Sequence, residues 1–216
     1  MQAKATNQGQ LTAKNSAAIT TTSSEKMSKP ILSILTPSVP SRAFSVSKLQ
    51  DEIASQTRHA GTVEHLVLVD NKARSIGLKR QALLDIARGE YIAFVDDDDA
   101  ILGGYVNAIL DAAKGKPDVI TFRQRAIYNG QQSEVVFGVE HQDEPFTPGG
   151  ITKRAPWHIC AWRRESVAQC LFGNTNYGED LVWAKQARRM IQTSVHIDQL
   201  LHEYRHNRTT TEAPEG

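Results

Sequence analysis

Residues Tyr91–Gly104 read YIAFVDDDDAILGG, an apolar run that ends abruptly in four consecutive aspartates. Four adjacent carboxylates repel one another, so the arrangement is unfavourable unless positive charge lies nearby. The apolar part, Ile92 to Val95, predicts a buried strand that delivers the aspartates to one edge of a sheet. Ligands of open parallel sheets bind outside the carboxyl ends of the strands. The stretch therefore predicts an α/β fold with a ligand site at Asp96–Asp99.

Two further apolar runs of the same form lie upstream of this stretch. ILSILTP begins at Ile31, and HLVLVD runs from His65 to Asp70, and both end in turn-forming or polar residues. Short apolar runs bounded in this way are typical of buried strands. If these strands are parallel neighbours, Asp70 lies at the same sheet edge as Asp96–Asp99.

The segments between these runs show apolar residues at helical spacing. They are 45–56, SIGLKRQALLDIARG at 75–89, and 104–113 after the aspartates. Ser75 is placed to cap the second helix, and Gly89 to end it. Together with a fourth apolar run, DVITFRQ, these units predict a mostly parallel central sheet with helices on both faces, of the doubly wound type.

The second half of the chain predicts a smaller mixed region beside the parallel sheet. A hairpin is expected around Asn129-Gly130, a dipeptide that favours tight turns. Segment 142–156 carries prolines and glycines and predicts a long loop of the kind that often acts as a lid. The other expected elements are a strand WHICAWR, a short helix ESVAQC, a helix GEDLVWAKQARRMI and an edge strand at 195–204.

Composition indicates an ordinary globular protein. The 216 residues carry a formal net charge of +1 and are 40% hydrophobic, which does not suit a general nucleic-acid binder. Two cysteines cannot form a dense disulfide framework, and no apolar run approaches the roughly 20 residues that span a bilayer. We therefore expect a cytoplasmic protein without membrane insertion, in a bacterium or a virus-infected host. Residues 30–206 are expected to form one domain between a disordered polar tail (1–29) and a flexible tail (207–216).

Four carboxylates at a sheet edge suit a hard divalent cation. Mg²⁺ and Mn²⁺ prefer oxygen ligands and commonly bridge to substrate phosphates. Such an ion offsets the repulsion among Asp96–Asp99 and attracts a diphosphate. The alternative is a solvated acidic turn in which Asp98 or Asp99 caps the next helix. The apolar strand before the run favours the metal site, because it anchors the start of the run in the core.

Three segments resemble family 2 glycosyltransferases of the A-type fold. In chain order they are ILTPSVPSR, LVLVDNKARSIGLKRQALLDIARGEYIAFVDDDDAI and GEDLVWAKQARRM. The resemblance extends from about Ile31 to Ile191, and its central block is specific. It implies a Rossmann-like fold, a nucleotide-sugar donor with a UDP-sugar expected first, and Mn²⁺ or Mg²⁺ as cofactor. The implied reaction moves one hexosyl or pentosyl group to a hydroxyl acceptor, with inversion at the anomeric carbon.

The resemblance also implies roles for residues in donor binding. Asp96 and Asp98 match the D-x-D positions that meet the ion and the donor, with Asp97 between them. Asp70 matches the acidic residue that contacts the nucleobase. The other implied donor-binding residues are Thr36, Pro37, Ser38 and Arg42 in the first loop and Lys79 and Arg80 in the following helix.

Asp180 matches the catalytic base of the family, with Glu179 beside it. A carboxylate in this role takes the proton of the acceptor hydroxyl. The alternative is a charge pair in the first turn of a helix, where acidic residues are favoured. His206 is the expected late histidine at the ion, with His202 of the same LLHEYRH segment as the other candidate. Trp157 and Arg163 are expected to bind the acceptor.

Departures from the family pattern concern the donor contacts. SVPSR stands where an aromatic residue or Asn is usual, DNKA replaces D-D-G-S, and Ser75-Ile76 replaces an Arg-Asn pair. The aspartate segment itself is intact, so these changes leave the metal site in place and the identity of the base open.

Other functions share parts of this pattern. A nucleotidyltransferase also uses aspartates and Mg²⁺ beside a parallel sheet, but it usually needs a glycine-rich loop, and SVPSR has no glycine. A non-catalytic sugar-nucleotide-binding module is the third interpretation. The acceptor of a transferase is expected to be a glycan or, given the basic cluster Lys153–Arg164, a modified DNA base that a phage enzyme extrudes from the duplex.

Overall fold

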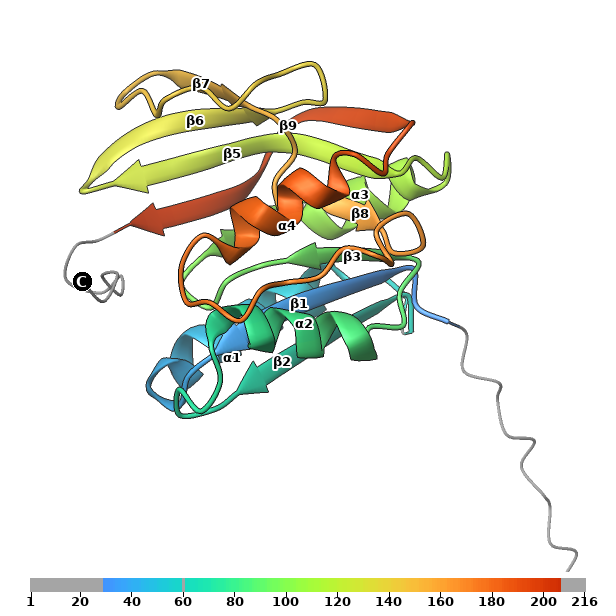
Figure 1. Ribbon diagram of the computed structural model, residues 1–216, viewed down its shortest axis with the longest axis vertical. Coiled ribbons are helices and arrows are strands. Elements are labelled where there is room, and N and C mark those ends of the chain that lie inside the picture. Colours follow the sequence, from blue (N-terminus) through green and yellow to red (C-terminus); the bar gives the residue numbers. More distant parts are fainter. Residues whose placement is uncertain (1–28, 60, 207–216) are drawn as a thin grey trace, which may run out of the picture.

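Figure 1 shows the computed structural model, which describes residues 29–59 and 61–206. Of the two expected tails, residues 1–28 and 207–216 lie outside this part of the chain. The strands are β1 (Leu32–Ser38), β2 (Val63–Val69), β3 (Tyr91–Phe94), β4 (Ala100–Ile101), β5 (Val119–Tyr128), β6 (Gln131–Phe137), β7 (Ile151–Arg154), β8 (Ala161–Arg163) and β9 (Ser194–His206). The helices are the short η1 (Pro40–Arg42) and α1 (Ala43–Gln56), α2 (Ile76–Ile86), α3 (Tyr105–Ala113) and α4 (Glu179–Ala187).

The first three long strands form a parallel unit with β1 in the middle. Leu32 at the start of β1 pairs with Val63 of β2 and with Tyr91 of β3. β1 and β3 are buried along their whole length, as expected for strands covered on both faces. All three strands therefore end at one sheet edge, which positions the predicted aspartate run there.

The α/β fold with a central sheet between helices is confirmed, and beyond β3 the sheet is mixed. The strand order is β2-β1-β3-β8-β5-β6-β7. The short β8 lies antiparallel between β3 and β5. β5, the DVITFRQ run, therefore has the direction of β3 without being its neighbour. In Figure 1, α2 and α4 lie in front of the sheet, with α1 and α3 behind it.

In the second half of the chain, several elements differ from those expected from the sequence. The hairpin at Asn129-Gly130 is confirmed: β5 and β6 pair antiparallel, and the two turn residues have φ of 49° and 83°. The expected loop 142–156 contains β7, which pairs with β6. WHICAWR forms a strand only in its last three residues, and ESVAQC forms turns instead of a helix. The expected edge strand is the long β9, which pairs with both β5 and β4.

Helix α2 starts where the sequence predicts and ends earlier. The Ser75 hydroxyl oxygen accepts a hydrogen bond from the Leu78 N–H, which is a side-chain cap. The helix ends at Ile86, three residues before Gly89. Gly89 has a different function, because a Cβ there would lie 2.6 Å from the backbone nitrogen of Ser33. The glycine thus allows the chain to pass close to β1 before β3 begins.

Replacing the cap of α2 is expected to have a moderate effect on stability. Ser75→Ala removes the acceptor for the Leu78 N–H and should lower the free energy of unfolding by about 1 kcal/mol. Ser75→Asp is the matched control, because it restores an acceptor at the same position. Urea unfolding of the three proteins measures the difference, and an equal loss in both variants would show that the cap itself does not stabilise the helix.

A cluster of aromatic residues holds α4 against the sheet. Trp183 of α4 is fully buried, stacks on Phe172 with ring centroids 5.1 Å apart, and packs edge-on against Trp162 of β8. Phe94, the last residue of β3, meets both Phe172 and Trp183. The start of α4 is thereby fixed near the end of β3. In the described part of the chain, no helix has the length and apolarity to cross a membrane.

Candidate active site

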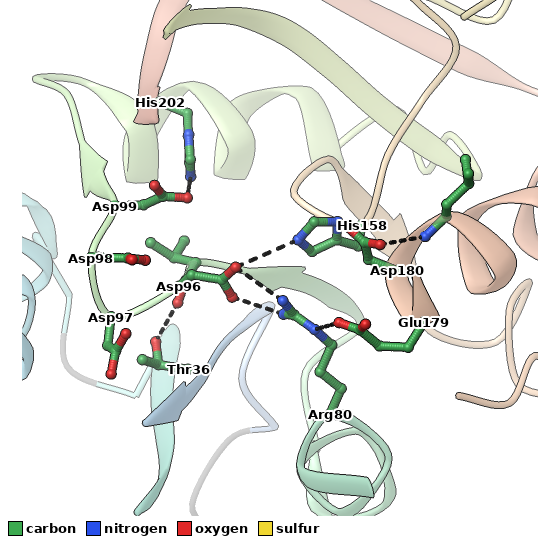
Figure 2. Close-up of polar contacts among 12 residues, drawn as sticks. Thr36, Arg80, Asp96, Asp97, Asp98, Asp99, His158, Glu179, Asp180 and His202 are labelled. Atoms are coloured by element: carbon green, nitrogen blue, oxygen red, sulfur yellow. Dashed lines mark hydrogen bonds and ion pairs between the residues drawn. The ribbon is translucent and has the colours of Figure 1, made fainter. Parts of the chain in front are cut away.

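The four aspartates fold into a tight turn directly after β3, as Figure 2 shows. The Asp99 N–H donates to the Asp96 carbonyl oxygen across 3.1 Å. The side chains of Asp97 and Asp99 are each 4% exposed, and those of Asp96 and Asp98 are 29% and 35% exposed. The run is therefore half-buried, which disfavours the alternative of a fully solvated turn.

Arg80 connects the aspartate run to the start of α4. Its guanidinium lies 2.8 Å and 2.9 Å from the two carboxylate oxygens of Asp96, and its Nε lies 3.2 Å from Oε1 of Glu179. The three side chains come from α2, the turn after β3 and α4, and Figure 2 shows them in one row. Burial alone raises the pKa of Asp96, but Arg80 outweighs it and lowers that pKa to about 2. Burial raises the pKa of Glu179 even though Arg80 opposes the shift.

The first loop supplies the partners of the next two aspartates. The Ser38 hydroxyl donates to Asp97 across 2.7 Å, and Arg42 lies 2.6 Å from Asp97 and 3.2 Å from Asp98. Thr36 lies deeper and donates to the Val95 carbonyl oxygen across 2.8 Å, so its hydroxyl links β1 to the residue that precedes the run.

The fourth aspartate faces a histidine from β9. Asp99 lies 3.5 Å from Nε2 of His202, and both side chains are buried. The other ring nitrogen of His202 lies 3.1 Å from the amide nitrogen of Gln124 on β5. Burial lowers the pKa of His202 to about 4, so the ring is neutral at pH 7. The mixed region of the sheet thus reaches the aspartate run through β9.

The site carries more negative than positive charge. The carboxyl groups of Asp96–Asp99, Glu179 and Asp180 share this edge with the guanidinium groups of Arg42 and Arg80. Burial, reinforced by the charge of Asp96, raises the pKa of Asp98 to about 6, and the same causes raise that of Asp99. Burial and the neighbouring carboxylates thus disfavour the charged forms of both side chains.

The donor chemistry fits a hard divalent ion, although the side chains do not form a ready cage. Carboxylate oxygens are the ligands that Mg²⁺ and Mn²⁺ prefer, and negative charge is in excess. In the ranges 29–59 and 61–206, however, no group of three His, Cys, Asp or Glu side chains is arranged to hold a metal. The reason is that Asp96 faces Arg80, while Asp97 and Asp98 face Arg42.

Asp180 and Asp96 lie on either side of a buried histidine. His158 precedes β8, and its Nδ1 lies 3.6 Å from Oδ2 of Asp180, while its Nε2 lies 4.0 Å from Oδ2 of Asp96. Burial lowers the pKa of His158 to about 4, with Arg80 as a further cause, so the ring is neutral at pH 7. Asp180 is 23% exposed, whereas Glu179 is 5% exposed and bound by Arg80. Only Asp180 of this pair is therefore accessible to a substrate.

Comparison with known proteins places the chain in a family. The family described as "Glycosyl transferase family 2" matches residues 52–171, which is more than half of the chain and includes the aspartate run. The chain belongs to glycosyl transferase family 2. The matched range ends before Glu179, so the roles of that residue and of Asp180 are not part of the match. No curated protein matches the chain in sequence.

Solved structures similar to this family 2 chain include TarS of S. aureus. TarS 1–349 matches with a TM-score of 0.63 and 16% identity over 81% of this chain and 60% of that chain. TarS 1–349 in complex with UDP matches with a TM-score of 0.64 and 17% identity over the same shares. TarS 1–349 in complex with UDP-GlcNAc matches with 0.61 and 14% over 84% and 61%. At these identities the likeness shows the fold, and the chain spans about 60% of the length of these relatives.

The nucleobase residue expected in this family 2 chain has a partner within the protein. Asp70 follows β2 and lies 2.7 Å from Nζ of Lys79, which also donates to the Ser38 carbonyl oxygen across 3.0 Å. Lys79 is 4% exposed, so its buried ammonium group holds Asp70 and the Ser38 end of β1 close together. Pro37 lies between Thr36 and Ser38 at the end of β1. The structure brings these residues together, and their role in donor binding stays a prediction.

The acceptor residues expected from the sequence are only partly brought to the site. Trp157 adjoins His158, and its Nε1 donates to Asp143 across 3.1 Å. Arg163 is misplaced: it pairs with Tyr91 at the first residue of β3 and lies 3.4 Å from Glu165. The aspartate run starts five residues later in the chain, which is roughly 16 Å of extended strand, so Arg163 lies at the opposite edge of the sheet. Arg163 is therefore not brought to the aspartate run, and its role in acceptor binding stays a prediction.

The basic cluster of the sequence also disperses. Arg154 lies over the ring of Trp157 at 4.9 Å from its centroid, and Arg164 donates to the Gly89 carbonyl oxygen. With Arg163 at the far edge, Lys153–Arg164 is not one basic surface. The observation that suggested a DNA-base acceptor therefore loses its support.

Of the two histidines at the site, His202 was a sequence candidate beside His206, whereas His158 was not identified from the sequence. His158 and His202 meet the aspartates only through the folded chain, and neither lies in a motif with metal-ligand spacing. His206, the expected ligand, is the last residue of β9, and its role at an ion stays a prediction. The period of β9 gave no signal, because Leu201, His202 and Glu203 are all buried and burial does not alternate there.

Proposed function

We propose that the protein transfers one sugar from a nucleotide-diphosphate donor to a hydroxyl acceptor, with inversion at the anomeric carbon. Family membership supports the reaction class. The single observation that carries the mechanism is the meeting of the aspartate run with the start of α4, through Arg80 on one side and His158 on the other. A donor-binding group and a candidate base have to lie this close for a direct displacement.

The residues of the site divide the chemistry between them. Asp98 and Asp96 would hold Mn²⁺ or Mg²⁺. A bound ion of this kind would stabilise the negative charge on the departing diphosphate. Asp180 takes the proton of the acceptor hydroxyl as that oxygen attacks the anomeric carbon. Arg80 binds both Asp96 and the start of α4. It therefore keeps a fixed distance between the carboxylate that contacts the donor, Asp96, and the base, Asp180.

A UDP-sugar is the donor that the comparisons favour. TarS has been solved with UDP and with UDP-GlcNAc, and this chain shares its fold over 81% and 84% of its length. Near the first loop, the Asp70 carboxylate can accept hydrogen bonds and the Lys79 ammonium group can donate them. This pair suits recognition of the edge of a nucleobase. We infer that the acceptor is a glycan or another hydroxyl compound and that the reaction takes place in the cytoplasm.

Donor binding with and without metal tests this function. A UDP-sugar with Mn²⁺ should raise the melting temperature, because a ligand that binds only the native state stabilises it by mass action. Asp98→Asn is expected to weaken Mn²⁺-dependent binding about tenfold or more in calorimetry, a loss of about 1.4 kcal/mol.

The control for this test is Asp111→Asn, because Asp111 is an exposed residue of α3 that pairs with Lys114. It should bind the donor like the parent protein. Donor affinity that is the same with Mn²⁺ and with a chelator would contradict the metal site. If wild type releases no UDP from any UDP-sugar in the presence of hydroxyl acceptors, the binding-module interpretation gains instead.

A further inference from the structure

His158 is held rigidly at the centre of the site. Its carbonyl oxygen accepts from the Phe94 N–H, which fixes the turn before β8 to the end of β3. The side chain is 7% exposed and packs beside the rings of Phe94 and Trp157. The ring is thus fixed by packing on its apolar sides while both nitrogens remain directed at carboxylates.

The hydrogen bonding of this ring is incomplete. Most buried polar groups in proteins have a partner. Within the described residues, however, neither nitrogen of His158 has a hydrogen-bond partner. A neutral imidazole carries one N–H, so it can donate to only one of the two carboxylates that flank it. Asp96 already receives one hydrogen bond and one further ion-pair contact from Arg80. Asp180 has no cationic partner at comparable distance among the described ion pairs.

The carboxylate of Asp180 is held from its other side by the helix backbone. The Leu181 N–H donates to Oδ1 of Asp180 across 2.7 Å, and Oδ2 is the oxygen that faces Nδ1 of His158. A hydrogen bond from Nδ1 would therefore fix the plane of the carboxylate through both oxygens. The 3.6 Å separation is slightly too long for a hydrogen bond, and catalytic hydrogen bonds are often long in the absence of substrate.

We propose that His158 is a positioning residue that donates its Nδ1–H to Asp180 and orients that carboxylate toward the acceptor hydroxyl. The inference rests on the proposed function, since it assigns a partner to the proposed base. A histidine that only fills the core would have its nitrogens bonded to backbone groups or would not face two acidic side chains. His158 therefore acts through Asp180 and not by packing alone.

A double-mutant cycle tests this role in the whole protein. His158→Leu should lower kcat about 10- to 100-fold and leave the affinity for the UDP-sugar unchanged, as for other groups that orient a reactive ligand. In an Asp180→Asn background the same change should cause no further loss. His158→Asn should restore most of the rate, because the Asn amide places an N–H close to the position of Nδ1–H.

The matched control is His196→Leu, which removes an exposed histidine of β9 that contacts Thr121. It should leave kcat unchanged. A loss from His158→Leu of equal size in both backgrounds, or one that falls on donor affinity, would overturn the proposal. The second result would instead indicate a contact to the ion or the donor.

Nitrogen NMR of the histidine rings gives a readout that does not depend on activity. His158 should carry its proton on Nδ1, and Asp180→Ala should move it to Nε2. An Nε2–H ring in the parent protein, or a ring that does not respond to Asp180→Ala, would contradict the proposal. If wild type transfers no sugar, the proposed function fails, and the NMR result still decides whether His158 donates to Asp180.

Discussion

Replacing Arg80 with methionine is expected to lower the free energy of unfolding by about 3–5 kcal/mol, because it leaves one buried and one partly buried carboxylate without their cation. The Arg80 side chain is 4% exposed, and its two partners, Asp96 and Glu179, are 29% and 5% exposed. Its guanidinium also lies 5.3 Å from the ring centroid of Phe94. Methionine keeps much of the apolar stem, so the loss reports mainly on the charge.

The matched control for this variant is Arg88→Met. Arg88 also bonds a carboxylate, Glu64, but it is 62% exposed, and exposed pairs contribute only about 0–1 kcal/mol. Urea unfolding of both variants measures the contrast. Arg80→Lys should recover part of the loss, since an ammonium supplies the charge without the fork that reaches Asp96 and Glu179 together. Equal, small losses in Arg80→Met and Arg88→Met would show that Arg80 does not hold the site together.

The sequence was sufficient to predict the parts of the site that depend on local pattern. The apolar run before Asp96 predicted a strand, and Ser75 predicted the cap of α2, because neighbouring residues determine both features. The position of the aspartates at a sheet edge followed from the parallel order of β1 and β3. These features form within about 15 residues of chain, where hydrophobic period and capping chemistry are readable.

The remaining parts depend on contacts between distant segments. Arg80 and Glu179 are separated by 99 positions, and no pattern in either helix specifies the pair. β8 is three residues long and enters the sheet because Trp162 fits beside Trp183, which local period does not indicate. The same reason explains why the sequence did not place Arg163, whose position depends on the direction in which β8 joins β3. Tertiary packing decided these features over local propensity.

Asp180→Asn is expected to lower kcat about 10²- to 10⁴-fold while donor affinity stays close to that of the parent protein. The amide keeps the shape of the side chain, and its oxygen still accepts from the Leu181 N–H, so α4 should begin as before. The amide cannot take a proton from the acceptor hydroxyl. UDP release in the presence of acceptor, measured beside calorimetry of donor binding, separates the two effects.

Two matched variants determine whether this loss belongs to the base. Asp198→Asn changes an aspartate that is 81% exposed and pairs with Arg123, and it should not alter the rate. Glu179→Gln should act mainly on stability, because Glu179 is buried and bound by Arg80, so its carboxylate is not available to an acceptor.

An Asp180→Asn protein that transfers sugar at the parent rate would show that another group takes the proton. A Glu179→Gln protein that folds normally but transfers no sugar would move the role of base to the neighbouring position. The different exposure of these two adjacent carboxylates is the reason to expect neither result.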